Sequence, residues 1–187
     1  LVLPPGQSVL SSADIVFVVD ESGSMGTEQA WIGDAVTALD AALESQGVTD
    51  NRYGLVGFSY APRTLQSGDD PFMTSAQFAE ATDLLSTTRT GHEEGYAAID
   101  YALQEYAFRP GAASSIVLVT DEERTELLLY IDYDVMVERL EAAQMPLHVV
   151  ANAYLADGDG ETAFAVDSDG DAYVADGANG SAAGDTY

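Results

Sequence analysis

Short, nearly continuous apolar runs indicate buried strands. Residues 13–20 and 115–121 are two such runs, each ending in an aspartate, and residues 147–153 form a third. Runs of this kind are typical of strands buried on both faces of a parallel sheet. Residues 52–60 are predicted to form a further strand, whose glycines allow neighbouring backbone to come close, and an edge strand is expected near residues 64–66.

Helices are predicted between these strands, where apolar residues recur at helical spacing. The first follows a loop at 21–26 and is expected to be capped by Thr27 and to end at Gly47. The others are predicted at 76–86, 94–107 and 132–143. Strands that alternate with helices are joined by right-handed crossovers. We therefore predict an α/β fold with a doubly wound, mostly parallel central sheet flanked by helices.

The end of the chain has a different composition. Residues 157–187 are rich in Asp, Gly and Ala, and we predict an acidic hairpin there, with strands at 164–166 and 172–174. The turn between them resembles half of an EF-hand loop, but Ala172 stands where that loop needs glycine, which favours a solvated turn over a calcium site. We expect one domain, with its main body at 1–156 and the acidic segment as part of it.

The charge of the chain excludes several classes of partner. It has 32 acidic residues against six arginines and no lysine, a formal net charge of −26. Nucleic acid and anionic membrane surfaces are excluded because both need a basic surface, and no apolar run is long enough for membrane insertion. Bulk calcium or magnesium binding and adaptation to salt both explain the charge. Without cysteine there are no disulfides, zinc–thiolate sites or thiol catalysis.

Oxygen-bearing side chains are expected to meet at one edge of the sheet. Asp20 and Asp121 end two buried strands, Ser22 and Ser24 follow the first, and Thr90 precedes the helix expected at 94–107. Ligands of open α/β sheets bind at the carboxyl ends of the strands. Two carboxylates and three hydroxyls there predict a site for Mg²⁺ or Mn²⁺, or for a more loosely held Ca²⁺. Because only two of these side chains are carboxylates, a bound ion would still lack one anionic oxygen.

These residues resemble those of the von Willebrand factor A domain, also called the integrin I domain. The resemblance consists of the run Asp20-Glu21-Ser22-Gly23-Ser24, of Thr90 five residues before Gly95, and of Asp121 at the end of its strand. It implies a metal-ion-dependent adhesion site. Ser22, Ser24 and Thr90 would bind the cation directly, and Asp20 and Asp121 directly or through water. A Glu or Asp of a protein partner would complete the coordination.

The chain departs from the family pattern in two places. Glu122 stands where the family often has glycine, which could weaken an acidic ligand, favour Ca²⁺ or form a pair with Arg124. The family also usually ends in a helix on the sheet, whereas only the acidic hairpin follows residue 153, so the closing helix is either missing or replaced by another element. Four residues are expected at the rim of the site: Glu21, Met25, His92 and Glu122.

The resemblance implies a metal-dependent protein-binding or adhesion module, not an enzyme. We expect it to lie outside the cell or on its surface, within a larger bacterial or archaeal adhesin with flanking domains. An alternative is an intracellular assembly subunit that partners an AAA-type ATPase in the cytoplasm of a halophile. A third possibility is a structural spacer that the metal only stabilises. Catalysis is disfavoured because the chain has neither a G-x-S-x-G frame nor a phosphate-binding loop with lysine.

Overall fold

The computed structural model describes the chain in two compact units, Leu1–Ala151 and Asn152–Tyr187. The described residues are 11–89, 93–121 and 131–151 in the first unit, and 155–156, 162–166 and 172–174 in the second.

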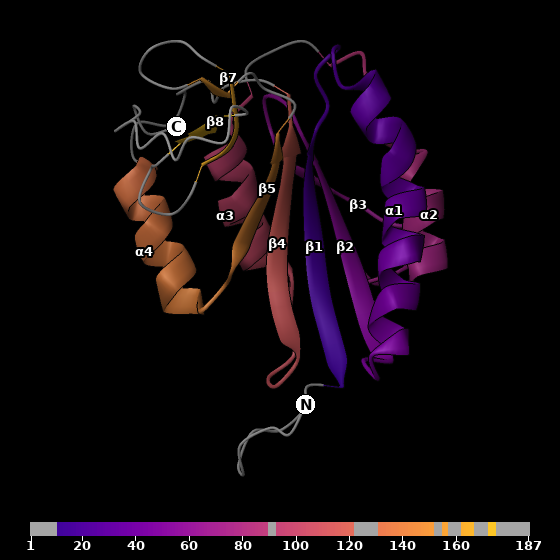
Figure 1. The fold of residues 1–187 in the computed structure, drawn as a ribbon. Helices are drawn as coiled ribbons and strands as arrows, with labels where there is room; N and C mark the ends of the chain where they lie inside the picture. Colours follow the sequence, from indigo (N-terminus) through magenta and orange to yellow (C-terminus); the bar gives the residue numbers. More distant parts are fainter. Residues whose placement is uncertain are drawn as a thin grey trace. The chain divides into compact units, whose positions relative to one another are not determined.

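A five-stranded sheet forms the centre of the first unit (Figure 1). Its strands are β1 (Ser12–Asp20), β2 (Asp50–Phe58), β3 (Arg63–Leu65), β4 (Ala113–Thr120) and β5 (Leu147–Ala151), in the order β3-β2-β1-β4-β5. β1 pairs in parallel with β2 and β4, and β4 pairs in parallel with β5, whereas β3 is antiparallel to β2. The predicted doubly wound, mostly parallel sheet is therefore confirmed.

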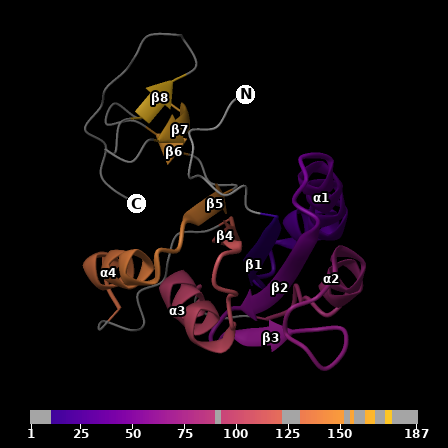
Figure 2. The same ribbon diagram turned by 90° about the horizontal axis from the view of Figure 1, so that it is seen from below.

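Helices cover both faces of this sheet (Figure 2). They are α1 (Gly26–Ser45), α2 (Ser75–Thr82), α3 (Gly95–Glu105) and α4 (Tyr133–Ala143). α1 and α2 lie on one face, and α3 and α4 lie on the other. The N-terminus of α2 is fixed by a capping box, in which the Thr74 hydroxyl accepts from the Gln77 backbone and the Gln77 side chain accepts from the Thr74 backbone.

Alternate residues of β1 belong to two separate hydrophobic cores. Phe17 and Val19 pack in the core that contains residues of α1 and α2, and Val16 and Val18 pack in the core that contains residues of α3 and α4. All four side chains are buried because the central strand is covered on both sides. This explains why β1 has an unbroken apolar sequence instead of an alternating one.

Three expectations about the elements are wrong. α1 begins at Gly26 with Met25 in the N-cap position and no side-chain cap, so Thr27 is not the cap. α2 ends at Thr82, earlier than the predicted residue 86. β5 is the edge strand and is largely exposed, so the burial on both faces expected for the run that begins at residue 147 is wrong. Among the described residues, no helix has the length and apolar character needed to cross a membrane.

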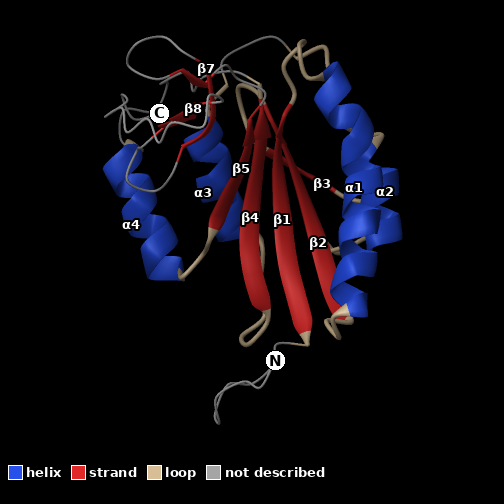
Figure 3. Ribbon diagram, in the orientation of Figure 1, coloured by secondary structure: helices blue, strands red, loops and turns tan. Residues whose placement is uncertain are grey.

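The second unit contains a small antiparallel sheet (Figure 3). Its strands are β6 (Leu155–Ala156), β7 (Thr162–Val166) and β8 (Ala172–Val174). β7 pairs with β8, with Val166 opposite Ala172, so the pairing of the predicted hairpin is confirmed. The acidic turn at 167–171 lies outside the described residues.

Candidate metal centre

The candidate site lies at the carboxyl edge of the sheet, where β1 and β4 end side by side. Their register pairs Val19 with Val119, which brings the next residues, Asp20 and Thr120, together. The Thr120 hydroxyl donates a hydrogen bond of 2.9 Å to Asp20 Oδ2. Asp121 follows directly, so the two aspartates expected from the sequence lie at the ends of adjacent strands.

The loop after β1 folds back on the Asp20 carboxylate. The backbone N–H of Ser22 donates to Asp20 Oδ1 at 2.8 Å. The hydroxyl oxygens of Ser22 and Ser24 lie 3.0 Å apart, within hydrogen-bond distance. A further backbone hydrogen bond, from Met25 N–H to the Ser22 carbonyl, closes the turn at 3.3 Å. The loop therefore places two hydroxyl oxygens together beside a carboxylate.

The negative charge at this edge is buried. The Asp20 side chain is fully buried, and this burial raises the pKa of Asp20 to about 6, although the backbone of Ser22 and the hydroxyl of Thr120 donate to its carboxylate. The nearby charge of Glu93 raises the pKa of Asp20 further. Asp121 Oδ1 is also buried and accepts no hydrogen bond from the described residues. Such an oxygen is costly unless a cation or a donor meets it.

The described arginines do not neutralise this charge. Four of them bind two other buried carboxylates: Arg52 and Arg109 bind Asp14, and Arg63 and Arg89 bind Glu21. The remaining described arginine, Arg139, forms an ion pair with Asp100. Among described residues, no group of three or more His, Asp or Glu side chains is arranged to hold a metal. A cation here would therefore depend on the serine hydroxyls as well as on carboxylates, and hard oxygen donors of this kind fit Mg²⁺, Mn²⁺ or Ca²⁺.

The other predicted site residues fall into two groups. Thr90, His92 and Glu122 lie outside the described residues. Glu21 and Met25, expected at the rim, are both fully buried. Met25 packs in the core beneath α1, and Glu21 forms ion pairs with arginines.

Two further residues near this edge were not singled out from the sequence. Glu93 is 8% exposed, and its charge acts on Asp20. Ser59 follows the last residue of β2, is 2% exposed, and its hydroxyl has no hydrogen-bond partner. Neither residue belongs to a motif, because one acid among 32 and one serine after a strand carry no distinguishing pattern.

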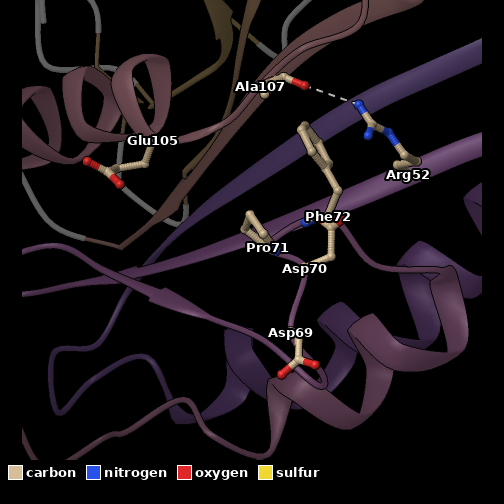
Figure 4. Close-up of a pocket in the computed structure, with 7 residues that line it drawn as sticks. All are labelled: Arg52, Asp69, Asp70, Pro71, Phe72, Glu105 and Ala107. Carbon is tan, nitrogen blue, oxygen red and sulfur yellow. Dashed lines mark hydrogen bonds between the residues drawn. The ribbon is translucent and has the colours of Figure 1, made fainter.

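A pocket of about 510 Å³ lies at the other end of the sheet, around the start of β2 (Figure 4). Two of its polar residues, Arg52 and Asp70, already have protein partners. Arg52 donates to the Ala107 carbonyl and to Asp14, and its guanidinium lies 4.2 Å from the Phe72 ring centroid. Asp70 accepts from the Phe72 backbone. Because ligands of such sheets bind at the carboxyl ends of strands, we place the candidate site at the opposite edge.

Comparison of the sequence with profiles of protein families assigns the chain to a family. The family profile of the von Willebrand factor type A domain matches residues 14–172. The chain belongs to this family. The family resemblance predicted from the sequence is thus confirmed.

Individual relatives share the fold with low sequence identity. Mouse vitrin is 33% identical over 118 residues, which are 62% of this chain and only 18% of vitrin. A structure of proximal thread matrix protein 1 from the mussel byssus, with a zinc-occupied MIDAS (metal-ion-dependent adhesion site) motif, matches with a TM-score of 0.59 and 17% identity, covering 76% of this chain and 36% of that one. The protein BatB from Bacteroides thetaiotaomicron matches with a TM-score of 0.53 and 18% identity, covering 86% and 74%.

Proposed function

We propose that this protein is a metal-dependent protein-binding module. A divalent cation would be held by Asp20, Ser22, Ser24, Thr90 and Asp121, and it would offer a position at which a Glu or Asp carboxylate of a protein partner binds. The observation that carries this proposal is the buried negative charge at the sheet edge, with which no described arginine pairs. Asp20 is fully buried, and Asp121 Oδ1 is buried without a hydrogen-bond donor.

Mg²⁺ is the cation we propose first, with Mn²⁺ and Ca²⁺ as the alternatives. All the proposed ligands are oxygens, and only two are carboxylates, which suits a small ion that keeps water and accepts an external anion. The zinc-occupied motif of the mussel protein supports a divalent cation at this type of edge in general.

Binding is favoured over catalysis by the surroundings of the serines. The Ser22 and Ser24 hydroxyls lie within hydrogen-bond distance of each other, and paired hydroxyl oxygens beside a carboxylate suit a hard cation. His148, the described histidine, lies on the exposed edge strand β5.

We further propose a place on the cell surface or outside the cell, within a longer protein that carries flanking domains. The match to only 18% of vitrin shows that a domain of this type occurs inside a much larger chain. The net charge of −26 favours a protein partner with exposed, metal-binding acidic groups over any polyanion.

Thermal melting with and without metal tests the proposal. The protein is melted in about 1 M NaCl with EDTA and then with Mg²⁺, Mn²⁺ or Ca²⁺ added back. A cation that binds only the folded state stabilises it by about 2.7 kcal/mol at 100 times its dissociation constant. We expect a saturable shift for the wild type and none for Asp121→Ala. Asp34→Ala, on the exposed side of α1, is the control for lost charge and should shift like the wild type.

The carboxylate-binding step is tested with acetate as a probe. In the presence of Mg²⁺, NMR signals of the Ser22 and Ser24 amides should move as acetate is added, and with EDTA they should not. Equal metal shifts in the wild type and Asp121→Ala would refute the metal site. A metal shift without any response to acetate would leave a metal-stabilised spacer as the better interpretation.

A further inference from the structure

Glu21 stands in the sequence directly between two of the proposed metal ligands, Asp20 and Ser22. The Glu21 side chain is fully buried. Its Oε1 accepts hydrogen bonds from Arg63 Nη2 at 2.5 Å and from the backbone N–H of Ser86 at 2.9 Å. Its Oε2 accepts from Arg63 Nε and from Arg89 Nη1, both at 3.1 Å. Both oxygens of this one carboxylate are thus fully engaged.

These contacts join three segments that are distant in sequence. Glu21 belongs to the loop that carries Ser22 and Ser24, Arg63 begins β3, and Arg89 is the residue directly before Thr90. Thr90 itself lies outside the described residues. The Glu21 carboxylate therefore holds Arg89, the residue before the proposed ligand Thr90, against the loop that carries Ser22 and Ser24.

Other contacts fasten the same two loops. Gln29 Nε2 donates to the Asp20 carbonyl at 2.9 Å and to the Ser86 carbonyl at 3.2 Å. Gly23 packs against Thr87, since a Cβ built on it would lie 3.5 Å from the Thr87 carbonyl oxygen. The loop that leads to residue 89 is therefore held along its length.

The strand next to Glu21 leaves room for its carboxylate. A Cβ built on Gly57 would lie 2.7 Å from both Cδ and Oε2 of Glu21. A buried ion pair is a weak source of stability, because desolvation offsets most of its attraction. Buried, multiply bonded ionic groups are better explained by the geometry that they impose.

We propose that Glu21 is a positioning residue of the metal centre: through Arg89 and Ser86 it holds residues 86–89 against the loop of Ser22 and Ser24, so that this loop keeps its shape before the cation arrives. This inference rests on the proposed metal site. Supporting residues around a metal centre typically contribute about 10–100-fold in affinity.

The chain contains a closely matched control for the test. Asp14, on the same strand β1 but toward its other end, is also a fully buried carboxylate that binds two arginines, Arg52 and Arg109, and one backbone N–H. Asp14→Asn and Glu21→Gln thus remove the same kind of interaction. Both should lower the melting temperature, but only Glu21 borders the proposed metal ligands.

The experiment is calorimetric titration of Mg²⁺ into wild type, Glu21→Gln, Asp14→Asn and Asp121→Ala, each below its melting temperature. We expect Glu21→Gln to weaken Mg²⁺ binding by about 10-fold or more and Asp14→Asn to leave it within about twofold of the wild type. Arg89→Gln keeps the pair of Glu21 with Arg63, and it serves if Glu21→Gln does not fold. It should weaken Mg²⁺ binding in the same direction.

The outcomes separate the two proposals. If the wild type binds no Mg²⁺ saturably, or Asp121→Ala binds it equally well, the proposed metal site fails. If the wild type binds Mg²⁺ and Asp121→Ala does not, the site stands, and the role of Glu21 is then decided by its own variants. Unchanged affinity in Glu21→Gln and Arg89→Gln, or an equal loss in Asp14→Asn, would overturn it.

Discussion

Replacing Asp20 by asparagine should stabilise the metal-free protein. Burial raises the pKa of Asp20 from 3.8 to about 6, with a further contribution from Glu93. A difference of this size means that the ionised carboxylate destabilises the fold by about 3 kcal/mol at pH 7. Asparagine has the same shape, and its Oδ1 can still accept from the Ser22 backbone. Its amide group can donate to the Thr120 hydroxyl oxygen.

The sign of the pH dependence follows from the direction of the shift. Because the folded-state pKa of Asp20 is the higher one, the destabilisation is complete above about pH 6 and disappears as the pH falls toward 3.8. The advantage of Asp20→Asn should therefore be largest at pH 7 and fall by about half at pH 5. A gain of about 2–3 kcal/mol corresponds to a rise in melting temperature of roughly 4–12 °C for a chain of this size.

The assay is urea unfolding followed by circular dichroism in about 1 M NaCl with EDTA, at pH 7 and pH 5. Asp34→Asn changes the same charge on the exposed side of α1 and measures the general benefit of reducing the net charge. The reasoning is refuted if Asp20→Asn is no more stable than Asp34→Asn at pH 7, or if its advantage is the same at pH 5. Adding Mg²⁺ at about 1,000 times its dissociation constant should reverse the order, because binding would then stabilise the chain with the carboxylate by about 4 kcal/mol.

Two further predictions concern the buried carboxylates that have arginine partners. Gly57→Ala should destabilise the protein by roughly 1–3 kcal/mol in urea unfolding, because the added methyl group would overlap the Glu21 carboxylate. A decrease in the free energy of unfolding of less than about 0.5 kcal/mol would contradict this prediction. Burial alone would raise the pKa of Asp14, but hydrogen bonds from Arg52 and Arg109 outweigh it and hold that pKa below its usual value. The ionised Asp14 therefore stabilises the fold above its unfolded-state pKa, and this stabilisation is lost as the pH falls through its folded-state pKa. Asp14→Asn should for this reason flatten the acid side of a plot of melting temperature against pH. An unchanged plot would contradict this prediction.

The order of the elements and the central strands could be predicted from the sequence because burial on both faces leaves a clear signal. β1 and β4 both contain continuous apolar runs and contribute residues to both cores, although β1 is almost fully buried and in β4 only Ile116 and Val119 are. β5 has an equally apolar sequence, yet Val149 is 57% exposed in the described part of the chain. Hydrophobicity along a strand cannot show whether a further strand or helix will cover it, so the edge position was missed.

The proposed ligands could be predicted from local spacing, whereas their supporting contacts could not. Asp20 ends β1, Ser22 and Ser24 follow it in the next loop, and the strand register then brings Thr120 to Asp20. Glu21 was expected at the rim of the site. Its arginine partners are 42 and 68 residues away in the sequence, and only the folded chain brings them to it.

Some buried carboxylates of this protein pair with described arginines, and others do not. The whole chain has only six arginines for 32 acidic residues. Four of them are bound to two carboxylates, Asp14 and Glu21, both fully buried. Asp20 lies on the same strand as Asp14 and next to Glu21 and is equally buried, but no described arginine pairs with it or with the buried Asp121 Oδ1. Because the described arginines neutralise Asp14 and Glu21 but neither Asp20 nor Asp121, these two aspartates at the sheet edge are the carboxylates of the described chain best suited to receive positive charge from a cation in solution.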